Sequence, residues 1–427
     1  MTGADSTDTP RYVWGIRIAG MAMLACVLAM TFAVPLGPGL VNVETVRQEV
    51  TAQSGVFELE ITGHNTHFSS NAPLVFLKNG DNIVNATAIK ALDDARLKCR
   101  IRVGKFLPAR SWDVYVNNGV DGTMSYANGF FATDVATNPK ARTDGDAAVL
   151  DYLSVPNLPF HFPFQPNIME TIRNLMLHVP MWFTMFLLMG ISFAQSIRTL
   201  RLGGDTDCDL KAVASVKVGL WFGVLGLLTG SLWARFTWGA WWVDDPQLNG
   251  AFVTVLVYAG YLVLRASIQE PLLRARLSGV YNLFGFCLLV VLLMVLPRFT
   301  ESLHPGKGGN PAFSSYDLDS ALRLVFYPAV LGWMVLGTWM YSAALKAERL
   351  RHRLSEARLT KASMPLGMLL MTPASTSGWE AWFLSSGKLN VVVGVAVIIF
   401  SGLALWGWRM RRELKSLSED LERLKTN

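Results

Sequence analysis

Long uncharged stretches recur along the chain, separated by shorter polar segments. A helix needs about 20 apolar residues to cross the hydrocarbon core of a bilayer. The sequence therefore predicts six core spans and one further span near the C-terminus. They cover Ile18–Leu36, Asn174–Ile197, Val218–Ala234, Leu248–Leu264, Leu277–Pro297, Leu324–Leu345 and Leu389–Trp408.

Between residues 40 and 170 the pattern changes to short stretches in which apolar and polar residues alternate. Alternation of this kind, with Asn-Gly turns between the stretches, is typical of strands that bury one face. We expect an all-β domain in the style of an Ig-like sandwich. Its predicted strands are Phe57–Thr62, Pro73–Lys78, Ile83–Ile89, Leu97–Val103 and Trp112–Asn117.

These patterns divide the chain into five segments. We predict an N-terminal helix (1–39), a β-domain with its linker (40–170), a helical core (171–346), a cytoplasmic or re-entrant connector (347–385), and a last helix with a charged tail (386–427).

The composition agrees with a membrane protein, since 51% of the 427 residues are apolar and only 16% are charged. The net charge of +6 lies mostly in short loops and the tail, and it does not imply a nucleic-acid partner. No G-x-x-x-x-G-K-[ST] motif is present, so this chain alone is not an ATP-hydrolysing subunit. The four cysteines are scattered and form no C-x-x-C pair, which gives no support for thiol redox chemistry.

Alternate connections between the core spans are rich in Lys and Arg, which by the positive-inside rule marks them as cytoplasmic. The opposite, periplasmic side then holds the loops around Trp238 and His304 and the His178 end of its helix. Arg11 and Arg17 precede the first span, and no convincing cleavage site follows it, so we expect a retained helix with its N-terminus inside. The β-domain would then lie outside the cytoplasm.

The last span presents a conflict. Counting spans places the basic end that follows Trp408 outside, whereas its charges favour the inside. The apolar run Met364–Met371 could dip into the membrane and repair the count, but it is too short to predict a span.

The segment with the most candidate chemistry lies between two core spans and holds four tryptophans in ten residues, Trp233 to Trp242. Tryptophan is favoured at membrane interfaces, so an aromatic belt is the simplest interpretation. A belt, however, requires no particular spacing. Here Gly239 and the acids Asp244 and Asp245 are interleaved with the rings, which suits an aromatic shelf for a flat, apolar ring system with charged edges.

The run Trp238-Gly-Ala-Trp-Trp-Val-Asp-Asp245-Pro resembles the tryptophan-rich WWD signature of CcmC-type haem-handling proteins of bacterial cytochrome c maturation. The flanking Leu177-His178-Val-Pro180 and Ser302-Leu-His304-Pro-Gly306 also fit. The resemblance implies that His178 and His304 are the axial ligands of a haem, since two neutral imidazoles can bind iron from opposite sides.

The resemblance also assigns the other residues of the site. Trp233, Trp238, Gly239, Trp241 and Trp242 would form the platform, and Asp245 would be a loop-fixing acceptor. Arg235 would pair with a haem propionate, although it could equally be an interfacial residue whose side chain snorkels. The sequence departs from the family pattern at Asp244, Gln247 and Asn249, where the family has a tryptophan, a basic residue and a threonine or serine.

Outside this segment, His64 and His67 form the most noticeable pair of possible metal ligands. Two histidines beside a turn are usually polar surface residues, so we do not predict a metal site there. His161 lies in a proline-rich linker and is expected to be a loop residue.

What the resemblance implies is an inner-membrane protein that binds haem b transiently at the periplasmic face and passes it to the haem chaperone CcmE. The expected partners are the CcmA and CcmB transporter subunits and membrane lipid. The last helix resembles the small protein CcmD, here fused to the core. Such a protein is a transfer component and not an enzyme, so no catalytic residue is assigned.

Two alternatives remain open from the sequence. A CcsA-type synthetase, which attaches haem to apocytochrome, would be expected to have further ligand histidines in its membrane helices, whereas the spans here hold only His178. The other alternative is a membrane anchor for the β-domain without any cofactor.

Overall fold

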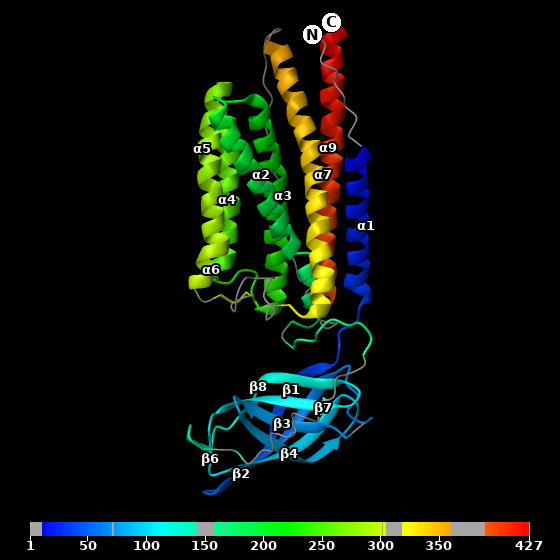
Figure 1. Ribbon diagram of the computed structural model, residues 1–427, viewed down its shortest axis with the longest axis vertical. Coiled ribbons are helices and arrows are strands. Elements are labelled where there is room, and N and C mark those ends of the chain that lie inside the picture. The colour runs from blue at the N-terminus through cyan, green and yellow to red at the C-terminus, as the bar shows by residue number, and fades with distance from the viewer. Residues whose placement is uncertain are drawn as a thin grey trace. The chain divides into compact units, whose positions relative to one another are not determined.

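The computed structural model describes residues 11–70, 72–141, 143, 158–166, 168–300, 302–304, 318–359 and 389–426. The chain divides into two compact units (Figure 1). One is helical and combines Met1–Phe32 with Glu170–Asn427, and the other, Ala33–Met169, is built from strands.

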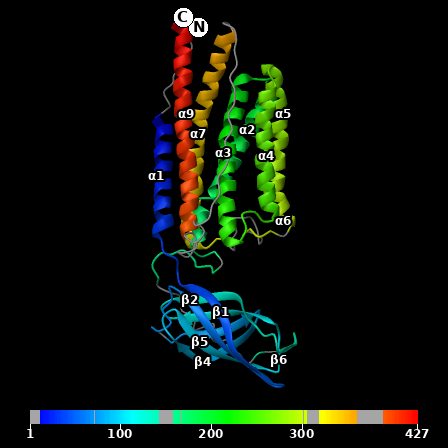
Figure 2. The same cartoon turned by 180° about the vertical axis from the view of Figure 1, so that it is seen from behind.

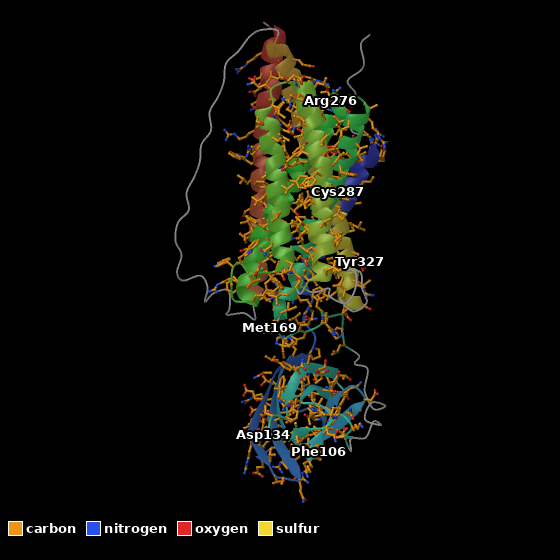
Figure 3. All side chains as sticks on the ribbon, turned by 90° about the vertical axis from the view of Figure 1, so that its left-hand side faces the viewer. Phe106, Asp134, Met169, Arg276, Cys287 and Tyr327 are labelled. Carbon is orange, nitrogen blue, oxygen red and sulfur yellow. The ribbon has the colours of Figure 1, made fainter. Side chains whose placement is uncertain are left out.

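Within the described residues, seven helices are long and apolar enough to cross a membrane, which confirms the predicted polytopic architecture. Charged side chains lie toward the helix ends. In Figure 3, Arg276 lies near one end of α5, whereas Cys287 lies in its uncharged middle. The helical elements are α1 (Arg11–Ala33), η2 (Met169–Met176), α2 (Val179–Arg201), α3 (Thr206–Thr237), α4 (Pro246–Ser267), α5 (Pro271–Val290), η3 (Val291–Val295), α6 (Leu296–Phe299), α7 (Ser320–Leu359) and α9 (Leu389–Thr426).

Several of these helices begin at an acidic capping residue. The carboxylates of Asp205, Asp245 and Glu270 accept hydrogen bonds from backbone N–H groups in the first turns of α3, α4 and α5. Pro246 and Pro271 then occupy first helical positions, where a missing N–H costs no hydrogen bond. These caps fix where each loop of the core ends.

Two helices extend well beyond the apolar spans that the sequence predicts. α3 begins at Thr206, and its first turns carry Asp209, which forms a bidentate ion pair with Arg265 of α4 at 2.6 and 2.7 Å. α7 continues to Leu359, so the first part of the predicted connector is helical. The remainder of that connector, including Met364–Met371, lies outside the described residues.

α1 packs closely against α7 because glycine occurs on both helices at their contact. A β-carbon on Gly20 would lie 2.4 Å from Val335, and one on Gly332 would lie 3.1 Å from Leu24. Small residues of this kind allow membrane helices to approach closely. The order of the contacts shows that the two helices are antiparallel.

α9 lies beside α7 and runs parallel to it, as the two opposite views show (Figures 1 and 2). Trp333 of α7 contacts Phe400 of α9, with ring centroids 6.3 Å apart. Further along both helices, Arg351 pairs with Glu413. The basic end of α9 therefore shares an end of the bundle with the basic end of α7, as its charges favour and contrary to the count of spans.

The second unit contains a seven-stranded antiparallel sheet in the order β1-β2-β5-β4-β3-β7-β8, curled until β1 and β8 approach each other in a nearly closed barrel (Figure 1), and a separate short parallel pair, β6-β9. The all-β prediction is confirmed, but the two separate sheets of an Ig-like sandwich are not found. The strands are β1 (Gly39–Val50), β2 (Ser54–His64), β3 (Leu74–Asn79), β4 (Asn82–Ala91), β5 (Arg96–Gly104), β6 (Phe106–Leu107), β7 (Ser111–Asn118), β8 (Gly122–Phe131) and β9 (Ala136–Thr137).

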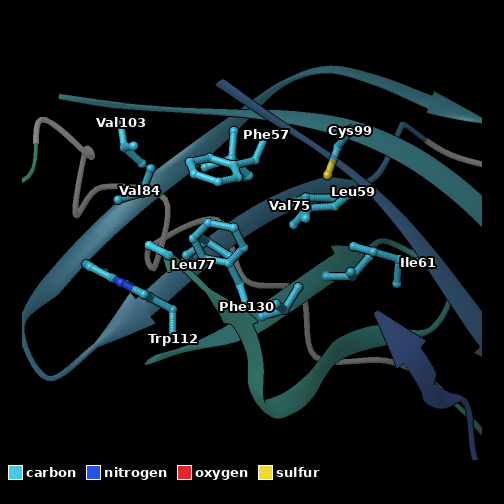
Figure 4. Close-up of a cluster of buried hydrophobic side chains, with 14 of the residues drawn as sticks. Phe57, Leu59, Ile61, Val75, Leu77, Val84, Cys99, Val103, Trp112 and Phe130 are labelled. Atoms are coloured by element: carbon cyan, nitrogen blue, oxygen red, sulfur yellow. The ribbon is translucent and has the colours of Figure 1, made fainter. Parts of the chain in front are cut away.

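The barrel interior is filled by every second residue of the strands, which explains its stability (Figure 4). On β2, Phe57, Leu59 and Ile61 are fully buried, and the residues between them are not. Phe57 packs edge to face on Phe130, with centroids 5.0 Å apart. Burial of a large apolar side chain contributes about 1.5–3 kcal/mol, so this alternation determines which face turns inward.

Candidate functional site

His178 lies at the start of α2 and is fixed through one ring nitrogen. Its Nδ1 is 2.8 Å from the hydroxyl of Thr229 on α3. That hydroxyl can donate its single proton to the carbonyl of Leu225, 2.7 Å away, and then accepts a proton from His178 Nδ1. In this arrangement Nε2 of His178 carries a lone pair.

Gly230 allows the ring of His178 to lie directly against α3. A β-carbon at this position would be 2.9 Å from Cε1 of His178, closer than such contacts occur. Thr229 and Gly230 therefore act together, because one orients the imidazole and the other leaves room for it. Both residues lie in the stretch Leu228–Trp233, which continues the resemblance to the family, but the sequence alone assigns neither of them a role.

Asp245 is the centre of the second half of the site. It is 1% exposed and caps α4, with Oδ1 accepting from the backbone N–H groups of Gln247 and Leu248. Its Oδ2 accepts from the Ser302 hydroxyl at 2.8 Å and from the Leu303 N–H at 2.7 Å. These bonds tie the loop that precedes α7 to the start of α4.

His304 is held in the same way. Its Nδ1 lies 3.0 Å from Oδ1 of Asp245. A carboxylate only accepts hydrogen bonds, so Nδ1 carries the proton and Nε2 again carries the lone pair. An acidic partner of this kind fixes the tautomer and orientation of a metal-binding histidine.

The charge states agree with this arrangement. Burial alone raises the pKa of Asp245, but the hydrogen bonds from Leu303 and Ser302 and the nearby His304 outweigh it and hold the pKa below its usual value. Burial lowers the pKa of His304, although Asp245 opposes this shift. At neutral pH the site thus combines a carboxylate with a neutral imidazole.

Ring contacts connect His304 to the end of α3. Trp238 meets His304 edge to face, with centroids 5.1 Å apart and planes at 73°. On its other side Trp238 contacts Trp233, also edge to face, at 5.0 Å. The structure therefore gathers His178, Thr229, Trp233, Trp238 and His304 around one end of α3.

Trp241 and Trp242 differ from these rings because they are exposed, at 43% and 41%. Their positions are nevertheless fixed: the Ser231 hydroxyl donates to the Trp241 carbonyl at 2.7 Å, and Trp242 Nε1 donates to Asn249 Oδ1 at 3.1 Å. Asn249 in turn donates to Asp244 at 2.9 Å. Two of the three departures from the family pattern therefore cooperate in orienting an exposed tryptophan.

Gly239 is needed for the shape of this loop. Its φ of +82° lies in the left-handed region that other residues avoid, although a β-carbon there would meet nothing within 4 Å. The carbonyl of Gly239 accepts a hydrogen bond from Arg235 at 2.5 Å. Arg235 therefore supports the loop from within.

The site fits a haem by the chemistry of its donors. Two histidines from different elements each use Nδ1 for an internal hydrogen bond, which leaves both Nε2 atoms for a metal. Exposed indoles beside them offer apolar surface to a flat ring.

By contrast, His64 and His67 take separate partners. His64 stacks on Phe164 at 4.9 Å, and His67 binds Asp121 at 2.8 Å.

Comparison with known proteins identifies the family of this chain. The family model of heme exporter protein C, CcmC, matches residues 145–365, just over half of the chain. The chain belongs to the CcmC family. The matched region contains His178, the tryptophan loop, Asp245 and His304, whereas strands β1–β9 and helix α9 lie outside it.

Individual relatives carry the name heme exporter protein C. That of Bradyrhizobium diazoefficiens is 28% identical over 45% of this CcmC-family chain and 72% of its own length. That of Rhodobacter capsulatus is 29% identical over 50% of this chain and 86% of its own. The protein of Escherichia coli strain K12 is 29% identical over 34% and 55%.

Proposed function

We propose that this CcmC-family protein handles haem in cytochrome c maturation. It binds haem at the periplasmic face of the inner membrane through Nε2 of His178 and Nε2 of His304, and then passes it to the chaperone CcmE. The observation that carries the proposal is the matched state of the two imidazoles, both fixed through Nδ1 with a lone pair on Nε2.

Further support comes from the way in which the site is held. Asp245 ties His304 to the tryptophan loop, and Thr229 ties His178 to the same end of α3. The exposed faces of Trp241 and Trp242 provide the apolar shelf. A site fixed on one side and open at the rings suits a ligand that is bound briefly and handed on.

The assignment of sides and partners rests on charge and resemblance. The positive-inside rule places the basic ends of α7 and α9 in the cytoplasm, and so the site and the β-unit in the periplasm. CcmA and CcmB are the proposed transporter partners, with α9 in the role of CcmD.

The proposal is tested by haem retention in the purified protein. His178→Ala and His304→Ala should each weaken the Soret band and stop delivery to CcmE, because each change removes an axial ligand. His161→Ala is the matched control, since His161 bonds through Nδ1 to the Pro159 carbonyl in the other unit. Two variants with an unchanged Soret band and normal cytochrome maturation would refute the assignment.

The aromatic shelf is tested separately. Replacing Trp241 and Trp242 together with alanine should lower haem occupancy while the helices remain inserted, because apolar contact with the porphyrin is lost. Trp408→Ala provides a control, as an exposed tryptophan on α9. If the double variant and Trp408→Ala bind equal amounts of haem, Trp241 and Trp242 serve only as interface anchors.

A further inference from the structure

A groove between α1 and α7 lies away from the tryptophan loop and has a volume of about 480 Å³. This volume lies within the range of small-molecule sites in proteins, about 300–1,000 Å³. Arg17 is the single charged residue of its lining, which otherwise comprises Trp14, Ile18, Met21, Ala22 and Trp339.

Arg17 is held between two indole rings. Its guanidinium carbon lies 5.5 Å from the ring centroid of Trp14 and 5.7 Å from that of Trp339. The two rings meet edge to face at 6.2 Å. Stacking on aromatic faces orients a guanidinium and leaves its N–H edge available to a planar or anionic acceptor.

Among the described residues, no carboxylate pairs with Arg17 and no hydrogen-bond acceptor receives its N–H groups. Three basic residues of the other helices do have a carboxylate partner, since Arg265 binds Asp209, Lys217 binds Glu348 and Arg349 binds Asp207. An unpaired cation in a membrane helix is costly, so a partner from outside the chain would stabilise it.

The depth of the groove indicates the kind of partner. Trp339 lies about two turns before Lys346 and nearly three turns before Arg349, the start of the basic end of α7. Ile18 and Met21, toward the middle of the bilayer, are 65% and 36% exposed. The groove thus offers a cation near the headgroup level and an apolar surface beneath it, which matches a phosphate with an acyl chain below.

We propose that this groove binds an anionic phospholipid, whose phosphate pairs with Arg17 and whose acyl chain lies along Ile18 and Met21. A headgroup without an ammonium group, such as that of phosphatidylglycerol, is favoured because it brings no cation of its own to compete with the guanidinium. Trp14 and Trp339 hold the guanidinium in place. The site is independent of haem and uses α1, which the family model does not cover.

The test uses the full chain purified into nanodiscs of phosphatidylcholine that contain 10 mole per cent phosphatidylglycerol as the probe. After extraction into mild detergent, native mass spectrometry counts the lipids that remain bound. In the lipid retained by the wild-type protein, the ratio of phosphatidylglycerol to phosphatidylcholine should be at least tenfold higher than in the nanodisc. Arg17→Gln should bring this ratio to that of the nanodisc, and Trp339→Leu should lower it severalfold.

Arg11→Gln is the matched control, because Arg11 lies on the same helix outside the groove, and it should retain lipid as the wild type does. Arg17→Lys keeps the charge that orients α1 but loses the planar stacking, so it should insert normally and retain less phosphatidylglycerol than the wild type. Competition by inorganic phosphate alone would indicate an anion site without a lipid. That result would overturn the proposal. Equal retention of phosphatidylglycerol and phosphatidylcholine by the wild type would also overturn it, and so would a protein that copurifies bound in the groove.

Discussion

The variant Thr229→Val tests whether haem binding requires the orientation of the His178 ring and not only the presence of this histidine. Valine has nearly the shape of threonine but lacks the hydroxyl that accepts the proton of His178 Nδ1 at 2.8 Å. Thr229 is fully buried, so no water replaces this acceptor. The imidazole must then either leave a buried N–H unsatisfied or move its proton to Nε2, where it would block the lone pair.

Either outcome weakens haem binding by a similar amount. An unsatisfied buried donor costs about 1–3 kcal/mol. If this cost falls on the bound state, the affinity for haem decreases by about 5- to 150-fold, since about 1.4 kcal/mol corresponds to a factor of ten. Loss of the partner of a metal-binding histidine generally lowers affinity by about 10- to 100-fold, which agrees.

The assay is a titration of haem-free protein in detergent, followed by the Soret absorbance, with thermal unfolding as a check on the fold. Thr229→Ser is the matched control, because it keeps the hydroxyl and loses only a methyl group, and it should bind within a fewfold of the wild type. Wild-type affinity in Thr229→Val would refute the reasoning. Equal weakening in both variants would instead assign the effect to the packing of the side chain at position 229 and not to its hydroxyl.

Three further predictions concern other residues. Asp245→Asn places an N–H group against the donors of the Ser302–Leu303 segment, so haem affinity should fall at least tenfold and amide hydrogen exchange at residues 302–304 should accelerate. Gly239→Ala should destabilise the loop by about 1–2 kcal/mol through its positive φ alone, lowering the haem-bound melting temperature, whereas Gly15→Ala, equally uncrowded but in helical conformation, should not. Cys99 is buried and its pKa is raised to about 12, so maleimide at pH 7.5 should leave it unlabelled until the β-unit unfolds, as mass spectrometry of digested protein would report.

The membrane helices could be predicted because their signal is local. An uncharged run of the right length reports a span without knowledge of its neighbours. The same signal misses charged extensions, so α3 and α7 are longer than predicted. The start of α3 looked like a loop because it holds Asp209, whose partner Arg265 becomes visible only in the packed structure.

The strands show where alternation stops being informative. β2 and β5 alternate strictly and were predicted, whereas β1 and β8 were not. The outer half of β1 is exposed on both faces, and β8 contains two glycines, so neither shows a regular pattern. The choice between a barrel and a sandwich depends on which strands pair, and alternation is identical in both.

In the candidate site, topology and the family resemblance indicated His178, His304 and the tryptophan loop but not the residues that support them. Thr229 and Gly230 lie in Leu228–Trp233, a stretch that also resembles the family, but a threonine and a glycine in an apolar helix indicate no particular role. Their roles arise from the face of α3 that meets His178, which a single sequence does not specify.

The contact of α9 with α7 and α3 is made within a single chain, so docking of this helix is an intramolecular event. Its occupancy depends on the effective concentration that the tether imposes and not on how much protein the membrane contains. A helix supplied as a separate chain would dissociate from its partner as expression falls. Fusion thus fixes the stoichiometry at one α9 for each core, even in a cell that makes only a few copies.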